Sequence, residues 1–180
     1  MRVGVRAAGL LLAASLAVLA GGCATPPPAA STSAWTSGRM VVRIDASPAR
    51  SASSLEADFE LRGDSRQGEL RLTSPLGSRL ATTRWSADEA VLDTGQGETR
   101  HADLEALSRA AFGELLPLRA LPDWLAGRPW PGAASDAQAD GFVQLGWRVS
   151  LAGLANGRID AVRDEPPRVV VRVRLERSPA

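Results

Sequence analysis

The stretch GELRLTSPLGSRLATTRW, residues 68–85, predicts two β-strands joined by a turn. Leu70 and Leu72 alternate with charged residues, the alternation stops at Ser74-Pro75-Leu76-Gly77, and the second strand begins at Arg79. Proline fixes its own φ and glycine tolerates positive φ, so both residues favour a turn here. Leu76 is unexpected, because residues at the end of a hairpin normally face water and are polar. It either folds back into the core or contacts something outside the domain.

Much of the remaining chain alternates apolar and polar residues in the same way. Between Leu55 and Leu61, four apolar residues are separated by single charged residues. This alternation is typical of antiparallel strands with one buried face and one face in water. Strands are predicted for residues 38–45, 54–62, 90–93, 98–100, 142–151, 158–163 and 168–176. The sequence therefore predicts an antiparallel sheet of eight to eleven strands, and a sheet of that length tends to curl.

The middle of the chain changes to a helical period. Asp103 is a typical N-cap for a helix over residues 104–111, and Gly113 is a typical stop. Pro117 can open a second short helix that extends to Leu125. Helices this short are not stable alone, so they must lie on the sheet. A curved sheet with a helical lid encloses an interior that suits an apolar ligand, unless side chains fill it.

The N-terminus predicts export and lipid attachment. Residues 1–22 combine two arginines with an apolar run, as secretory signals do, and end in Ala20-Gly21-Gly22-Cys23. That ending resembles the bacterial lipobox, in which the cysteine becomes N-terminal and acylated. The alternatives are an ordinary signal with an incidental cysteine, or an uncleaved anchor. Residues 23–37, rich in Pro, Ala, Ser and Thr, predict a tether, in which Trp35 marks a first contact with the domain over residues 38–178.

Composition and motifs exclude several classes of function. Removing Arg2 and Arg6 with the signal changes the formal net charge from +1 to −1, which gives no electrostatic reason to bind nucleic acid. Cys23 and His101 are the only cysteine and histidine, so neither a zinc site nor a Cys-His pair is predicted. Phosphate-binding and serine-hydrolase motifs are missing from the sequence. We therefore predict no catalytic residue, no metal and no cofactor.

Several motifs, taken in order, resemble the LolB family of outer-membrane lipoprotein receptors. They are the lipobox at Cys23, the tether, the Gly38-Arg39 strand entry, the loop run over residues 68–78, and Leu116-Pro117-Leu118 followed by Leu121 and Trp124-Leu125-Ala126-Gly127. The resemblance implies a half-open barrel of about eleven antiparallel strands, with a helical lid over an apolar cavity. It also implies a protein without enzymatic activity, which accepts lipoproteins from the periplasmic carrier LolA and inserts them into the outer membrane. Ala24, where an aspartate would resemble an inner-membrane retention signal, agrees with that location.

The resemblance and the strand pattern together suggest site residues. The resemblance implies that Leu76, in the loop Ser74, Pro75, Leu76, Gly77, is the family's protruding leucine, which acts in membrane insertion. This chain is shorter at its C-terminus than better-known members and contains no tyrosine, so the family's cavity lining is not carried over. The dry faces of the predicted strands and helices suggest a lining of Phe59, Leu61, Leu70, Leu72, Trp85, Leu121, Trp124, Leu145 and Trp147, although for each residue taken singly ordinary core packing is the favoured interpretation.

The partners predicted on this basis are LolA, acylated lipoprotein cargo and outer-membrane lipid, with the receptor itself a monomer. Two alternatives from other classes stay open at the level of sequence. One is a structural or assembly lipoprotein whose interior is filled by side chains, and the other is a lipid-binding module of similar shape with other cargo. Because a shared fold does not decide between them, the discriminating observation is the interior, which is either an open apolar cavity or a filled core.

Overall fold

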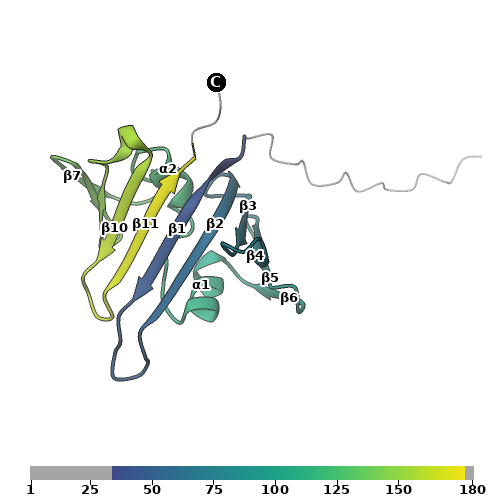
Figure 1. Cartoon of the computed structure of the whole chain (residues 1–180). Coiled ribbons are helices and arrows are strands. Elements are labelled where there is room, and N and C mark those ends of the chain that lie inside the picture. The colour runs from purple at the N-terminus through teal and green to yellow at the C-terminus, as the bar shows by residue number, and fades with distance from the viewer. Residues whose placement is uncertain (1–33, 177–180) are drawn as a thin grey trace, which may run out of the picture. The chain divides into compact units, whose positions relative to one another are not determined.

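Eleven strands form one antiparallel sheet in the computed structural model, which describes residues 34–176 (Figure 1). In chain order they are β1 (Thr36–Ile44), β2 (Ser53–Gly63), β3 (Gly68–Thr73), β4 (Arg79–Trp85), β5 (Ala90–Asp93), β6 (Glu98–His101), β7 (Ser135–Gln138), β8 (Gly141–Gln144), β9 (Trp147–Ser150), β10 (Arg158–Arg163) and β11 (Val169–Leu175). The spatial order runs β6-β5-β4-β3-β2-β1-β11-β10-β9-β8-β7. The fold class predicted from the sequence is thereby confirmed.

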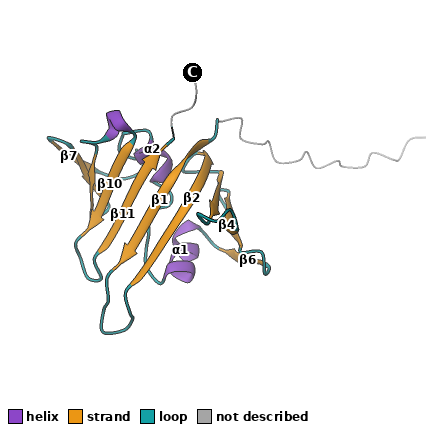
Figure 2. Ribbon diagram, viewed as in Figure 1, coloured by secondary structure: helices purple, strands orange, loops and turns teal. Residues whose placement is uncertain are grey.

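The first and last strands pair at the centre of the sheet. β1 pairs with β2 from Thr36–Leu61 to Ile44–Ser53, and with β11 from Gly38–Leu175 to Ile44–Val169. Every other pair joins strands that are neighbours in sequence, so β6 and β7 remain as two separate edges and the sheet is not closed. Figure 2 shows the sheet curving around the helices, which is the arrangement of a half-open barrel. β1 begins at Thr36, two residues before the predicted start of the domain.

The helical insert, residues 102–134, lies between β6 and β7 in the chain. α1 (Leu104–Phe112) begins at the predicted N-cap, where the Asp103 carboxylate accepts a 2.6 Å hydrogen bond from the Ala106 amide, and it ends at Gly113 with φ of 66°. α2 (Leu121–Leu125) begins later than the predicted Pro117, because the Ala120 amide instead closes a turn onto the Pro117 carbonyl. Both helices lie on the same side of the sheet, behind the central strands in Figure 2. A 3-10 helix, η1 (Leu154–Asn156), precedes β10.

The prediction of a single strand over residues 142–151 was wrong. β8 and β9 form a hairpin whose turn is Leu145-Gly146, and Leu145 has φ of 55°. Gln144 and Trp147 pair directly across the hairpin and point to the same face, so the inward positions change there from even to odd numbers. Apolar residues occupy the odd positions on both sides of the turn and within it. The sequence pattern therefore gives no sign that the inward-facing positions change there. β7, whose four residues are all exposed, carries no alternation and was missed.

The buried side chains lie between the inner face of the sheet and the insert. Met40, Val42 and Phe59 come from the two central strands, and Leu107 and Trp124 come from the insert. The two short helices are therefore stabilised by packing rather than by their own propensity. This arrangement places the insert over the inner face, where the cavity lies.

Candidate functional site

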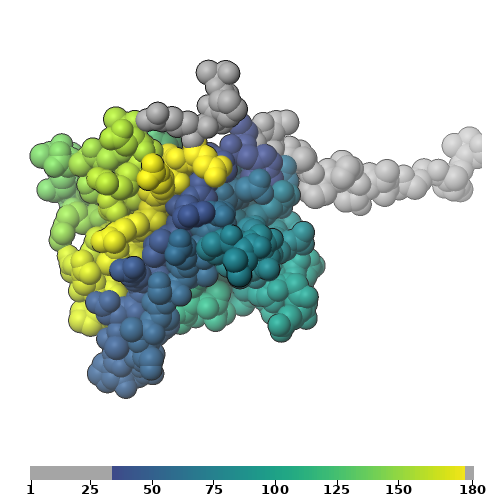
Figure 3. Space-filling view, viewed as in Figure 1, coloured from purple at the N-terminus to yellow at the C-terminus, as the bar shows by residue number. Residues whose placement is uncertain are grey.

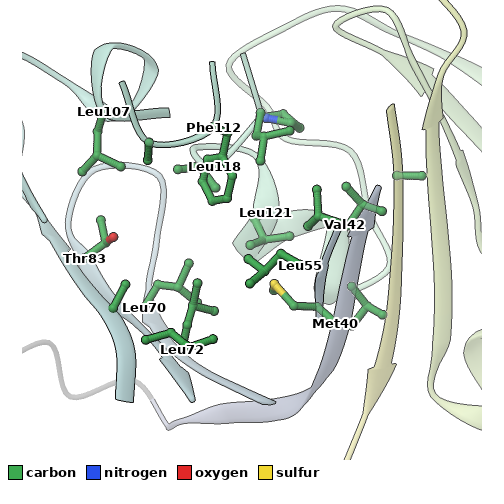
Figure 4. A pocket seen from close by; sticks show the side chains of 18 of the residues that line it. Met40, Val42, Leu55, Leu70, Leu72, Thr83, Leu107, Phe112, Leu118 and Leu121 are labelled. Atoms are coloured by element: carbon green, nitrogen blue, oxygen red, sulfur yellow. The ribbon is translucent and has the colours of Figure 1, made fainter. Parts of the chain in front are cut away.

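An apolar cavity of about 240 Å³ lies between the inner face of the sheet and the insert. In Figure 4, Leu107, Phe112 and Leu118 of the insert face the side chains of β1 to β4 across the cavity. Its lining consists of Met40, Val42, Leu55, Leu70, Leu72, Leu80, Ala81, Thr83, Leu92, Thr94, Leu107, Ala111, Phe112, Leu116, Pro117, Leu118, Leu121, Trp124, Leu125, Ile159, Ala161, Val171 and Val173. The two threonines carry the only hydroxyl groups and no lining residue is charged, so the cavity suits hydrocarbon rather than a polar ligand.

The residues suggested from the sequence divide into three groups. Four of them line the cavity: Leu70, Leu72, Leu121 and Trp124. Four others are buried beside it in the core, and they are Phe59, Leu61, Trp85 and Trp147. Leu145 does neither, because its side chain is 48% exposed in the β8–β9 turn. Its assignment to the dry face is corrected for the reason given above, the change of phase at that turn.

Most of the lining was not suggested by the strand pattern. The insert contributes Leu107, Phe112 and Leu118, and β10 and β11 contribute Ile159 and Val171, among others. The alternation of β11 does place its valines on the dry face. The alternation does not show which of these valines contact the insert and which line the cavity. That depends on the distance between the insert and the sheet at each valine.

Gln144 holds α2 on the sheet. It is fully buried in β8, where its Oε1 accepts hydrogen bonds from Trp124 Nε1 at 2.8 Å and from the Trp130 amide at 2.9 Å. Its Nε2 donates to the carbonyls of Trp130 at 2.7 Å and Ala133 at 2.9 Å. One side chain thus satisfies four groups of α2 and the loop after it. Trp124 also packs at 6.3 Å from the ring of Trp147.

The segment between α1 and α2 is attached at a second place. The Arg163 guanidinium, in β10, forms a 2.7 Å ion pair with Glu114 and donates to the Leu115 carbonyl at 3.3 Å. Arg50, from the turn between β1 and β2, donates to the Phe112 carbonyl at 2.6 Å. The insert is therefore bound to β8, to β10 and to the β1–β2 turn by the polar side chains of Gln144, Arg163 and Arg50, and none of these three residues lines the cavity.

The turn between β3 and β4 presents Leu76 to solvent. The Gly77 amide donates to the Ser74 carbonyl, and the Ser74 amide donates to the Ser78 carbonyl, each at 2.8 Å. Gly77 has φ of 83°, which leucine adopts only with strain, whereas Leu76 is not in that region. The Leu76 side chain is 94% exposed, so the alternative in which it folds back into the core is excluded. A hydrogen-bonded turn holds this apolar side chain in water.

The described residues show no site for chemistry. Within residues 34–176, no group of three or more acidic or histidine side chains could hold a metal ion, and no helix is long and apolar enough to span a bilayer. His101 lies in β6 with its Nε2 at 3.2 Å from the Thr99 hydroxyl. Cys23 and the predicted signal and tether, apart from its last four residues, lie outside the described residues. The candidate site therefore consists of the cavity and the Leu76 turn.

Comparison with known proteins decides the family. A family model described as outer membrane lipoprotein LolB matches residues 35–176, which is most of the chain. The chain belongs to the LolB family. The outer-membrane lipoprotein LolB of Bordetella petrii is 35% identical to it, over 91% of this chain and 89% of the relative. The protein of the same name from Chromobacterium violaceum is 31% identical, over 88% of each chain.

Membership of the LolB family confirms three predictions made from the sequence. They are the family itself, an outer-membrane lipoprotein as the class of protein, and the absence of enzymatic activity, since LolB proteins are lipoprotein receptors and not enzymes. A third relative, the LolB of Thiobacillus denitrificans, is 32% identical over 78% of this chain and 80% of its own length. The roles of individual residues are not decided by these similarities.

Proposed function

We propose that this LolB-family protein accepts acylated lipoproteins from the periplasmic carrier LolA and inserts them into the outer membrane. The observation that carries the proposal is the uncharged cavity of about 240 Å³, which an assembly protein with a filled interior would not have. Its lining offers no ion pair or amide to a peptide. The acyl chains of the cargo, rather than its polypeptide, are therefore the part that this cavity suits.

The size of the cavity bears on how cargo enters. Its volume of about 240 Å³ lies below the ~300–1,000 Å³ typical of ligand pockets. Several acyl chains fill such a space only if the lining moves apart. The insert is the part that can move, because side-chain packing and a few polar contacts hold it on the sheet, rather than strand pairing. We infer that uptake of cargo displaces the insert from the sheet.

Transfer without an energy source depends on keeping the acyl chains out of water. Exposure of each CH₂ group costs about 0.8 kcal/mol, so exposing several chains would cost tens of kcal/mol. A direct contact between the openings of carrier and receptor avoids that cost. Transfer then proceeds if the receptor binds the chains more tightly than the carrier does, and release proceeds because the bilayer binds them more tightly still.

Leu76 acts in the last step. Inserting one leucine into the bilayer contributes about 1.5–3 kcal/mol, which is enough to favour docking and too little to anchor the protein. The acylated Cys23 supplies the anchor. In this mechanism the exposed turn touches outer-membrane lipid while the cavity holds the cargo.

The proposal is tested by replacing Leu76 with glutamate and measuring two steps separately. With Leu76→Glu, we expect acceptance of a radiolabelled lipoprotein from the carrier to be unchanged and delivery from the receptor to liposomes to fall at least several-fold. Leu145→Glu is the matched control, because it places the same charge on another exposed leucine of a hairpin turn, and it should deliver normally. Equal loss of both steps, or loss of neither, would show that the turn does not act in delivery.

A further inference from the structure

The outer face of four neighbouring strands is strongly basic. Along β9, β10, β11 and β1, the residues that alternate with the inward-facing ones point away from the cavity. Asp160 is the one acidic residue among them. Six arginines share this surface, which we call the basic face, and they are Arg39, Arg43, Arg148, Arg158, Arg172 and Arg174. Figure 3 shows this face, with β10 and β11 in yellow shades beside the blue of β1.

Strand register places three of these arginines side by side. Arg174 in β11 pairs directly with Arg158 in β10 and with Arg39 in β1. Like charges directly opposite each other in a sheet are destabilising. Asp58 binds Arg39 at 2.9 Å, but Asp160 lies 3.7 Å from Arg158, and Arg174 forms no ion pair with another residue of the range 34–176. The charge of the row is thus only partly neutralised, and an arrangement that costs stability is typical of a functional surface.

An open groove runs along β10 and β11 within the basic face. Its lining consists of Arg158, Asp160, Val162, Arg168, Val170 and Arg172. Val162 and Val170 pair across the two strands and are half-buried, so a small apolar surface lies among the guanidinium groups. Guanidinium groups bind phosphate oxygens through paired hydrogen bonds. With three positive charges and one negative charge, the groove therefore suits the phosphate and glycerol region of a phospholipid.

The arginine row is in register with the end of β3 that carries the Leu76 turn. Arg39 pairs with Asp58 of β2, and Asp58 pairs with Thr73, the last residue of β3. Neighbouring strands lie about 4.8 Å apart, so the turn begins about 10 Å from β1. In Figure 3 the segment around this turn, in dark teal, stands on the same visible face as β1 and β2. One surface thus presents both the exposed leucine and the arginines.

We propose that the basic face docks onto the phosphate groups of anionic phospholipids, so that the outer face of the sheet lies against the bilayer. The inference rests on the proposed function only in taking Leu76 as a membrane contact. As a member of a family of outer-membrane lipoproteins, the domain always has a bilayer within reach. Each arginine close to an anionic bilayer strengthens binding about fivefold, so several arginines together select one orientation of the domain.

This orientation brings the cavity and the bilayer close together at the β3–β4 turn. Leu72 and Leu80, which flank the turn, line the cavity, whereas Leu76 within it is exposed. Acyl chains then have a short path along the turn from the cavity to lipid. The rest of the inner face is turned away from the bilayer and is left free for the carrier.

The test measures contact between the basic face and lipid, on liposomes that carry the full, acylated chain without cargo. A fluorophore is attached through Ser54→Cys, because Ser54 is exposed in β2 opposite Arg43, and phospholipids with a nitroxide on the head group quench it. We expect quenching to be several-fold stronger on liposomes that contain phosphatidylglycerol than on phosphatidylcholine alone. High salt should abolish that difference, because it screens the exposed charges.

Substitutions in the basic face then assign the effect to its arginines. Joint replacement by Arg158→Ser, Arg172→Ser and Arg174→Ser should remove the dependence on phosphatidylglycerol and leave acceptance of cargo from the carrier unchanged. Joint replacement of the same three residues by lysine keeps the charge and should retain most of the effect. The matched control is Arg66→Ser, Arg100→Ser and Arg109→Ser, which removes three exposed arginines outside the basic face and should retain all of it.

Three results would overturn the proposal. One is equal quenching of the parent protein on the two kinds of liposome, which decides the matter even if the serine variant does not fold. Another is a folded serine variant that is quenched like the parent protein. The third is a serine variant that keeps lipid-dependent quenching and loses acceptance of cargo, because the basic face would then bind an acidic carrier protein. Quenching that depends on these arginines, in a parent protein that delivers no lipoprotein, would support docking and contradict the proposed function.

Discussion

At the scale of single residues, two exposed leucines occupy turns of different backbone geometry. Leu76 lies between Pro75 and Gly77, and these neighbours supply the fixed φ and the positive φ that the turn requires. Its exposure therefore costs no backbone strain. Leu145 itself has φ of 55°, in a two-residue hairpin turn where Asn or Gly is usual. Of these two leucines, Leu76 is the one that is held exposed by a backbone without strain at that residue.

This difference predicts that the same substitution stabilises the protein at Leu145 and has little effect at Leu76. Leu145→Asn should raise the free energy of unfolding by about 1 kcal/mol, because asparagine tolerates the left-handed region and little buried surface is lost. Leu76→Asn should change it by no more than about 0.5 kcal/mol. Urea unfolding followed by tryptophan fluorescence measures both. Equal effects of the two substitutions would show that Leu145 carries no strain.

At the scale of secondary structure, the insert depends on polar side chains for its position. α2 has five residues and no side-chain cap, and it is held on the sheet by the packing of Trp124 against Phe142 and Trp147 and by hydrogen bonds to Gln144. α1 is better defined, with Asp103 and Gly113 at its ends. The segment between them is fixed by the Arg163–Glu114 ion pair. Movement of these helices as units would leave the strand pairing intact, which fits the proposed displacement of the insert by cargo.

Loss of the Gln144 amide should therefore destabilise α2 more than its size suggests. Gln144→Leu removes the partner of the buried Trp124 Nε1 and one partner from each of three partly buried backbone groups, and an unsatisfied buried group costs about 1–3 kcal/mol. We expect the free energy of unfolding to fall by at least about 3 kcal/mol in urea titrations. Gln138→Leu, on exposed β7, is the control and should change it by no more than about 0.5 kcal/mol. A loss below about 1 kcal/mol for Gln144→Leu would contradict this account.

At the scale of the whole domain, sheet and insert enclose a space that neither fills. Protein interiors are close-packed, so an uncharged, partly open cavity of about 240 Å³ between the sheet and the insert needs an explanation. Binding of hydrocarbon supplies one. The sheet is not closed, because β6 and β7 are separate edge strands. The cavity can therefore widen without the loss of strand pairing when the insert moves.

Filling the cavity should separate binding from folding. Ala161→Phe places a ring in the empty space, so we expect acceptance of lipoprotein from the carrier to fall several-fold, while the free energy of unfolding changes by less than about 1 kcal/mol. Ala57→Phe is the matched control, because Ala57 is fully buried and does not line the cavity. Overpacking there should cost about 1–3 kcal/mol or more. Unchanged acceptance by the Ala161→Phe protein would show that cargo binds elsewhere.

Local features of this domain were predictable because short-range physics determines them. The alternation from Leu55 to Leu61 indicates a strand, since only an extended backbone puts those side chains on one face. Asp103 and Gly113 mark the ends of α1, since one caps free amides and the other tolerates positive φ. The proline and glycine around Leu76 predicted its turn in the same way. The motifs taken together also indicated the family.

Only the tertiary structure decided how far each buried side chain lies from the opposite layer. Leu70 and Phe59 are both on the dry face, yet one borders the cavity and the other is packed in the core, because the insert covers the sheet unevenly. The turn at Leu145 was hidden because apolar residues continue through it while the strand direction reverses. Trp35 contacts arginines that follow it by 27 and 36 residues. Alternation determines which face a residue occupies, whereas long-range packing determines what that face meets.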